Sequence, residues 1–328
     1  YANQDANGND VDPFSDPVLN ASTKSLRSKT AGSYLYFSSN ASESAQIKSD
    51  FDGWIQAQAD DVFPNFSTVA AIGTAGQIAD GSSVRYVNAL GLEYDQAIVK
   101  GLIGAVMTDQ MLNNYLDPGV LDAGSNRTDN DDGVLYTDKN YTTMEHKWDE
   151  AYGYLFGNAP DGTDPMATLG DDDSFLNKYL ARVDGDDDFA GIAQDIFDAF
   201  KLGRAAIVAE RYDVRDEQAD IIREKISTVI AVRAVYYLQS GKTAMGNGET
   251  GSALHALSEA YGFIYSLRFT HNPTTGGPYL SATEVEGLLD DLMNDGAGGL
   301  WTVADTTLDD ISATIASRFN FTVEQTVN

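Results

Sequence analysis

The stretch HALSEAYGFI (His255–Ile264) indicates the fold class of this sequence, because HKWDEAYGYL (His146–Leu155) repeats its pattern H-x-x-x-E-A-Y-G. A long, mainly apolar stretch with helical spacing precedes each copy, over Leu92–Tyr115 for the first and Val214–Ser240 for the second. The order of a long helix and a motif helix therefore occurs twice. We interpret this order as an internal duplication of a helical unit.

Apolar residues recur at spacings of three and four along most of the chain, which is typical of amphipathic helices. The centre of Leu92–Tyr115 is apolar on all sides and predicts a buried helix, in which Gly101 and Gly104 would let another helix come close. Strand signals are few and favour one short hairpin near Arg85–Val87. Further helices are expected at Ser42–Val62, Thr143–Phe156, Phe175–Arg182, Phe189–Glu210, Ala253–Phe269, Ala282–Asn294 and Leu308–Arg318. The pattern predicts an all-α fold of two pseudo-symmetric antiparallel helical bundles with long loops.

The chain divides into an extended or partly helical lead-in over residues 1–40, a first helical repeat over 41–170 and a second over 171–328. The helix that starts at Val214 is expected to stop at Gly241. With 42% hydrophobic residues, a chain of 328 residues can bury a sizeable core. We therefore expect both repeats to pack together as one globular unit.

The charge of the chain argues against some classes of partner. Lys and Arg together number 21 against 50 Asp and Glu, which gives a formal net charge of −29. A field of this sign repels phosphate backbones, so we expect no nucleic acid partner. The sequence has no cysteine, which removes disulfides, thiolate metal ligands and thiol catalysis. It begins at Tyr1 and has no apolar run long enough to cross a membrane, which is compatible with a removed export signal.

Each motif places an imidazole beside a carboxylate on one helix face, with a glycine one turn further on. The two stripes are His146, Glu150 and Gly153 in the first copy and His255, Glu259 and Gly262 in the second. Three interpretations compete. The His and Glu could form buried polar pairs that fix helix register, or the motif helices could meet and hold a metal ion, or the stripes could be catalytic.

Asp149 makes the two copies chemically unequal, because the second copy has Ser258 at this place. An extra carboxylate favours the first copy if only one of them binds a metal. The predicted metal ligands are His146, Asp149, Glu150, His255 and Glu259, with iron or zinc as the metal.

Four stretches, MEHKWDEAYGYLFG, GRAAI, RDEQADIIREK and HALSEAYGFIYSLRF, occur in this order between Gly91 and Phe269. Together they resemble an imelysin-like family of exported bacterial proteins, in its branch of unknown function. The resemblance implies an all-helical fold of two pseudo-symmetric bundles. It also implies a periplasmic or outer-membrane-associated lipoprotein, with a lipid anchor upstream of this sequence, and a link to iron uptake.

The imelysin family carries G-x-H-x-x-E, a proposed metal site that was once taken as a peptidase signature. Here Glu150 comes four residues after His146, and the residue at three is Asp149. A zinc peptidase is expected to show H-E-x-x-H or a comparable set of ligands, which neither stripe has. We therefore expect a non-enzymatic, exported helical protein that binds a metal ion or a metal-bearing ligand. The alternatives are an imelysin-type metallopeptidase and an interaction or adhesion module without a metal.

Two acidic loops imitate the ligand spacing of an EF-hand calcium loop. The oxygen ligands would come from Asp5, Asn7, Asn9 and Asp16 in the first loop and from Asp184, Asp186, Asp188 and Asp195 in the second. Neither loop has glycine at the sixth position, and neither ends in glutamate. A solvated acidic turn or a helix N-cap is the alternative to calcium.

Basic residues are scarce and cluster at Arg204, Arg211, Arg215 and Arg223, on and between two predicted helices. In so acidic a chain we expect them to form internal salt bridges rather than an anion site. His271 follows the second motif helix in THNPTTGG, where we expect an exposed loop.

Overall fold

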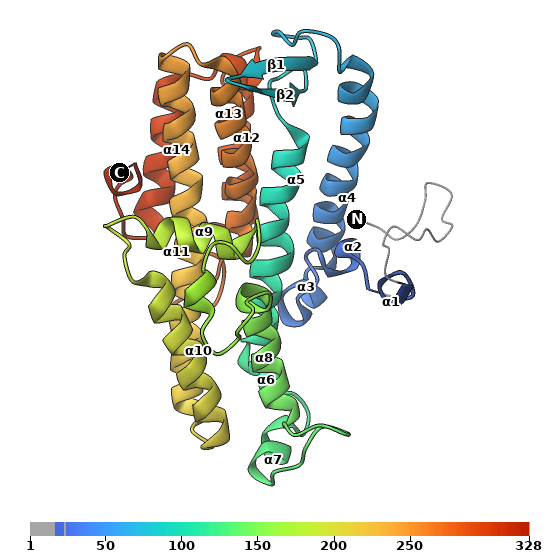
Figure 1. The fold of residues 1–328 in the computed structure, drawn as a ribbon, viewed down its shortest axis with the longest axis vertical. Coiled ribbons are helices and arrows are strands. Elements are labelled where there is room, and N and C mark those ends of the chain that lie inside the picture. The colour runs from blue at the N-terminus through green and yellow to red at the C-terminus, as the bar shows by residue number, and fades with distance from the viewer. Residues whose placement is uncertain (1–16, 23, 328) are drawn as a thin grey trace.

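The computed structural model describes residues 17–22 and 24–327, and within them it confirms the predicted all-α class. The longer helices are α4 (Ala41–Ala57), α5 (Tyr94–Leu102), α8 (Thr143–Phe156), α9 (Leu176–Asp184), α10 (Ile192–Val208), α11 (Tyr212–Gly246), α12 (Thr250–Ser266), α13 (Ala282–Asn294) and α14 (Asp305–Arg318). Short helices are α1 (Pro17–Asn20), α2 (Leu26–Lys29), α3 (Tyr34–Ser39), α6 (Pro118–Leu121) and α7 (Asn126–Asp131). The molecule is elongated, and α11 runs along much of its length (Figure 1).

Short non-α segments extend several of these helices. Two π-helical segments, Ile103–Thr108 and Met111–Tyr115, continue α5, and a third, Gln58–Val62, continues α4. The 3-10 turns are Phe63–Asn65, Pro165–Thr168, Leu267–Phe269, Gly299–Trp301 and Val323–Thr326. The predicted helix Leu92–Tyr115 is therefore one long element with changes of pitch rather than a uniform α-helix.

Among the described residues the strands form one hairpin, which lies at one end of the helices, at the top of Figure 1. Strand β1 (Gly76–Asp80) pairs antiparallel with β2 (Ser83–Val87), from Gly76 opposite Val87 to Asp80 opposite Ser83. Gly81 in the turn has φ of +58°, a conformation that glycine adopts without a Cβ penalty. The predicted hairpin is present, and the stretch near Arg85–Val87 forms its second strand.

Helix α12 packs closely against α5 and its continuation, because small residues face each other there. A Cβ on Gly262 would lie 2.5 Å from Cβ of Lys100, and one on Gly104 would lie 2.5 Å from Cβ of Ser266. Only glycine permits such an approach. The predicted role of Gly104 in close packing is confirmed, and Gly101 likewise lies against the ring of Phe51.

Gly241 does not end the helix that contains it, so that prediction is wrong. Helix α11 continues through this residue to Gly246. A Cβ on Gly241 would lie 2.6 Å from the side chain of Leu257 in α12. The missing side chain serves the contact between α11 and α12, not a helix cap.

One hydrophobic core runs through both predicted repeats. It includes Phe51 and Leu112 from the first half and Ile226 and Phe263 from the second, all with 0% exposure. The motif helices have different surroundings within this fold. Helix α12 lies among α5, α11 and α13 in the upper half of Figure 1, whereas α8 lies in the lower half and packs on α10. The internal duplication stays a prediction.

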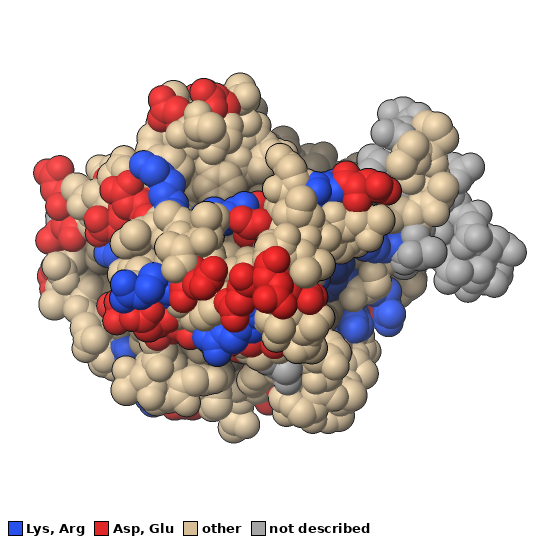
Figure 2. Space-filling model, turned by 90° about the horizontal axis from the view of Figure 1, so that it is seen from below, with Lys and Arg blue, Asp and Glu red and all other residues tan. Residues whose placement is uncertain are grey.

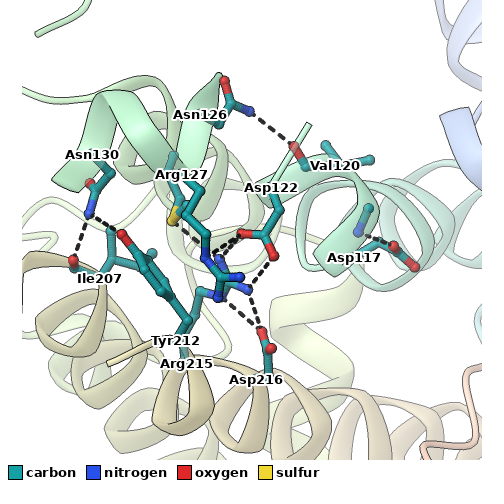
Figure 3. Close-up of polar contacts among 12 residues, drawn as sticks. Asp117, Val120, Asp122, Asn126, Arg127, Asn130, Ile207, Tyr212, Arg215 and Asp216 are labelled. Carbon is teal, nitrogen blue, oxygen red and sulfur yellow. Dashed lines mark hydrogen bonds and ion pairs between the residues drawn. The ribbon is translucent and has the colours of Figure 1, made fainter. Parts of the chain in front are cut away.

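Ion pairs fix the lower end of the molecule. The side chain of Arg215 is fully buried and pairs with Asp122 at 2.7 Å and with Asp216 at 2.8 Å (Figure 3). The guanidinium of Arg127 lies 4.2 Å from the ring centroid of Tyr212. The segment that joins α6 to α7 is thereby held against the start of α11. The short helices α6 and α7 are not among those expected from the sequence.

The basic cluster forms the salt bridges that the sequence predicts. Arg204 pairs with Glu145 and Asp149, Arg223 with Asp117 and Asp220, and the exposed Arg211 with Asp213. Seen from below, Lys and Arg residues lie among Asp and Glu residues rather than forming a separate basic field (Figure 2).

His271 lies in the core, so the prediction of an exposed loop is wrong. It is 8% exposed, its Nδ1 lies 2.9 Å from Oδ1 of Asn113, and its backbone N–H donates to Oγ of Ser227 at 2.9 Å. These contacts fold the chain after α12 back against α11 and the second π segment. Burial lowers the pKa of His271 to about 3, with Arg223 adding to the effect.

Alanine at the two equivalent glycines of the motif should have opposite effects on stability. Gly262→Ala forces a Cβ against α5 and should lower the free energy of unfolding by about 1–3 kcal/mol. Gly153→Ala is the matched control, because a Cβ there meets nothing within 4 Å, and it should add about 0.5–1 kcal/mol. Urea unfolding of both variants measures the difference, and equal effects would contradict the close packing of α12.

Acid should destabilise the fold through His271. Because the pKa is lower in the folded state than the unfolded value of 6.5, the unfolded chain binds a proton first as the pH falls. Stability from this residue is therefore present above pH 6.5 and falls by about 1.4 kcal/mol per pH unit toward pH 3. His271→Gln should flatten this slope in unfolding curves between pH 6.5 and 4. Thr275→Ala, in the exposed part of the same loop, should retain it.

Candidate functional site

His255 of the second stripe lies between two carboxylates. Its Nδ1 is 2.8 Å from Oε2 of Glu93, and its Nε2 is 3.8 Å from Oε2 of Glu259. The Glu93 side chain is only 3% exposed. Burial raises the pKa of Glu93, while the hydrogen bond with His255 opposes that rise. A carboxylate on Nδ1 fixes the orientation of the imidazole and directs Nε2 toward Glu259.

The start of α5 holds Glu93 in place. Glu93 is the residue before the first turn of α5, and its backbone N–H donates to Oγ of Ser258 at 2.9 Å. Ser258 belongs to α12 and follows His255 by three residues. The close approach of the two helices at Gly262 therefore brings Glu93 within reach of the imidazole.

Lys100 completes the polar cluster of the second stripe. Its Nζ lies 3.2 Å from Oε1 of Glu259, and both side chains are about nine-tenths buried, with 9% and 10% exposure. The hydroxyl of Tyr179 donates to the same oxygen at 3.2 Å. Burial and the neighbouring Glu259 raise the pKa of Tyr179, so its hydroxyl stays protonated and acts as a donor.

This cluster forms part of the wall of a pocket of about 720 Å³ among α5, α9, α11 and α12. His255, Glu259, Lys100, Tyr179, Arg182 and Tyr237 are among its lining residues. Burial raises the pKa of Tyr237 as well, and its hydroxyl accepts a hydrogen bond from Nη1 of Arg182 at 3.1 Å. A volume of this size suits a small molecule, and the lining offers both hydrogen-bond donors and acceptors.

Asp80 connects the pocket to the hairpin. It accepts hydrogen bonds from the Ser252 hydroxyl and from Nε of Arg85, and these bonds hold the pKa of Asp80 below its usual value. Its charge is therefore present at neutral pH and compensated by Arg85.

The first stripe is more exposed and lines a separate pocket of about 420 Å³. Nε2 of His146 lies 3.3 Å from Oε1 of Glu150, with side chains that are 33% and 38% exposed. The imidazole stacks on the ring of Tyr141, at 5.3 Å between centroids and an angle of 15°. The pair of histidine and glutamate at i and i+4 is present as the spacing predicts.

Asp149 pairs with Arg204 and lines the same pocket as His146 and Glu150. Nε of Arg204 donates to Oδ1 of Asp149 at 3.0 Å, and Nη1 donates to Glu145 at 2.7 Å. Burial raises the pKa of Asp149 and Arg204 opposes that rise. The extra carboxylate that favoured the first stripe as a metal site therefore takes part in the contact between α8 and α10.

The structure does not bring the five predicted metal ligands into one site, because the stripes line different pockets. Throughout residues 17–22 and 24–327, no group of three or more His, Asp or Glu side chains has the geometry to hold a metal ion. At the second stripe the two imidazole nitrogens face different carboxylates, and the Lys100 ammonium lies where it would repel a cation. Iron or zinc stays a prediction, and the first stripe could offer it two ligands.

The second acidic loop acts mainly as a helix cap. Oδ1 of Asp184 accepts from the backbone N–H groups of Gly191 and Ala193, at the start of α10. Asp195 pairs with Nζ of Lys225 at 2.7 Å. The Asp184 contact matches the N-cap alternative, the Asp195 contact is a salt bridge, and calcium at this loop stays a prediction. The first acidic loop, Asp5 to Asp16, lies outside the described residues.

Sequence reasoning missed Glu93 and Lys100 at α5 and Tyr179 and Arg182 on α9, two segments that are distant from the motif in sequence. One signal was available. Lys100 is the only charged residue between Asp95 and Asp109, inside a stretch that is otherwise apolar. A charged lysine buried there is stabilised by a carboxylate partner, and the motif glutamate Glu259 is that partner.

The fold and this pocket define an all-helical protein with a polar site between its central helices. A family model described as "Domain of unknown function (DUF4856)" matches residues 2–322, so the chain belongs to that family. No curated protein and no solved structure matches the chain.

Removing the first stripe tests the metal prediction. If the stripe binds iron or zinc, element analysis of the purified protein should find the metal, and His146→Ala with Glu150→Ala should lose it. The matched control is His255→Ala with Glu259→Ala, which removes the same groups from the second stripe. Native protein without metal, or unchanged metal in the first variant, would contradict the prediction.

Proposed function

We propose that the protein is a non-enzymatic binding protein for a small polar molecule, which occupies the pocket among α5, α9, α11 and α12. The observation that carries this proposal is the polar cluster of His255, Glu259 and Lys100, which lines a pocket of about 720 Å³ and in which the buried Glu93 holds His255 from behind. Here His255, Glu259 and Lys100 also line a space large enough for a small ligand.

The cluster supplies a fixed set of hydrogen-bonding groups. The imidazole is oriented by Glu93, and Glu259 is oriented by Lys100 and Tyr179. Groups that are already ordered lose little entropy when a ligand binds, which favours affinity. The stripe is thus a preorganised part of a binding site rather than a metal centre.

The other expectations from the sequence stay predictions beside this proposal. A metal-bearing ligand falls within the class of small polar molecules, whereas a bare cation at the second stripe is disfavoured by Lys100. Peptidase activity, export, a lipid anchor and a link to iron uptake rest on the resemblance. Among the residues that the structure describes, no helix combines the length and apolarity needed to cross a bilayer.

Filling the pocket should abolish binding. Ser240 lines the pocket from α11, and Ser240→Phe places a ring in it. Ser317→Phe is the control, because Ser317 is exposed on α14 and outside this lining. A panel of small polar compounds should contain at least one that raises the melting temperature of the native protein and the control but not of Ser240→Phe.

A ligand at 100 times its Kd should add about 2.7 kcal/mol to the stability of the native protein. Calorimetric titration of the same compound gives the Kd directly. The proposal fails if no compound stabilises the native protein, or if Ser240→Phe folds and binds with native affinity.

A further inference from the structure

Three cationic side chains gather at one side of the pocket without a carboxylate partner. Lys178 and Arg182 line the pocket and lie one turn apart on α9. Arg233 is 5% exposed and lies one turn before Tyr236 and Tyr237 on α11. Within the described part of the chain, no carboxylate oxygen lies within 4.0 Å of a charged side-chain nitrogen of any of the three.

Every other arginine of the chain forms an ion pair, so Arg182 and Arg233 stand apart. The paired arginines are Arg27, Arg85, Arg127, Arg204, Arg211, Arg215, Arg223, Arg268 and Arg318. The chain has 50 Asp and Glu residues against 21 Lys and Arg residues, so carboxylates outnumber the cations that they could pair with. Both arginines that lack one lie beside the same pocket.

Tyrosine rings, rather than carboxylates, lie against Arg182 and Arg233. The ring centroid of Tyr179 lies 5.4 Å from Nζ of Lys100 and 5.6 Å from Cζ of both Arg182 and Arg233. Cζ of Arg233 also lies 4.5 Å from the ring of Tyr237. Aromatic faces stabilise cations, but each such contact contributes less than a hydrogen-bonded counter-ion.

Arg233 keeps unused donors. Its Nε and Nη2 are buried and have no hydrogen-bond partner among the described residues. The acidic groups of the pocket do not compensate this charge, because Asp80 pairs with Arg85 and Glu259 pairs with Lys100. The side of the pocket formed by α9 and α11 is therefore a local positive region in a protein of net charge −29.

We propose that the ligand carries an anionic group, a carboxylate or a phosphate, that binds to Lys178 and Arg182 with Arg233 behind them. This inference rests on the proposed function and adds the charge of the ligand to it. Arginine presents a planar pair of donors that matches the oxygens of either anion. The protonated Tyr237 hydroxyl is beside Arg182, and the rest of the ligand extends toward His255 and Glu259.

Calorimetric titration of the full chain with citrate, with inorganic phosphate and with uncharged glycerol tests this proposal and separates its two anion classes. We expect at least one anion to bind and glycerol not to bind. Lys178→Gln and Arg182→Gln should each weaken anion binding by about tenfold or more, the effect of losing one hydrogen bond to a charged group. Arg211→Gln is the matched control, because it removes the same charge from an exposed ion pair, and it should bind as the native protein does.

The outcomes distinguish this inference from the function on which it rests. If neither anion binds, or if both pocket variants bind with native affinity, the anionic ligand is wrong. The binding function still stands in that case when an uncharged compound binds the native protein and not Ser240→Phe. If anion binding survives in Ser240→Phe, the anion binds elsewhere, and both proposals fail. Circular dichroism of each variant shows that it is folded before the titration is interpreted.

Discussion

The close approach of α12 to α5 and α11 is the constraint on which the rest of the structure depends. Gly262 of α12 and Gly104 in the continuation of α5 let these two elements approach closely. Gly241 of α11 leaves room for the side chain of Leu257 from α12. A helix pressed between two others at these distances has one rotational setting, since any turn would drive a side chain into a neighbouring backbone. That setting directs His255 and Glu259 at Glu93 and Lys100. The close packing of α12 therefore also sets the geometry of the site.

Much of the fold could be predicted from local patterns. The bounds of α8 and α13 agree with those expected from apolar spacing and capping residues, because both begin at a capping box, at Thr142 and Ser281. Gly241 misled the prediction, since a glycine that permits contact and one that ends a helix look alike in sequence. His271 misled it for a related reason. The polar stretch around it indicates a loop, and only the contacts with Asn113 and Ser227 make part of that loop buried.

The candidate site could be predicted only in part. The motif correctly marked His255 and Glu259 as neighbours, because their spacing lies within one helix. The partners Glu93, Lys100 and Arg182 come from segments far away in sequence, and no local pattern states which helices will meet. The extra carboxylate Asp149 favoured the first stripe over the second as the predicted metal site. In three dimensions that carboxylate serves Arg204, and the second stripe adjoins the larger pocket.

The π segments that continue α5 lie in one long helical element whose two ends make different contacts. Before them, Lys100 faces the pocket; after the first, Asp109 lies fully buried and accepts from the backbone N–H groups of Gly32 and Ser33. A π turn inserts one extra residue into the helical repeat, so the angular phase of the lower part is offset from that of the upper part. Loss of that one residue would rotate everything below by about 100°. The number of residues in Ile103–Thr108 therefore determines which side chains of the lower part face the core, independently of their identity.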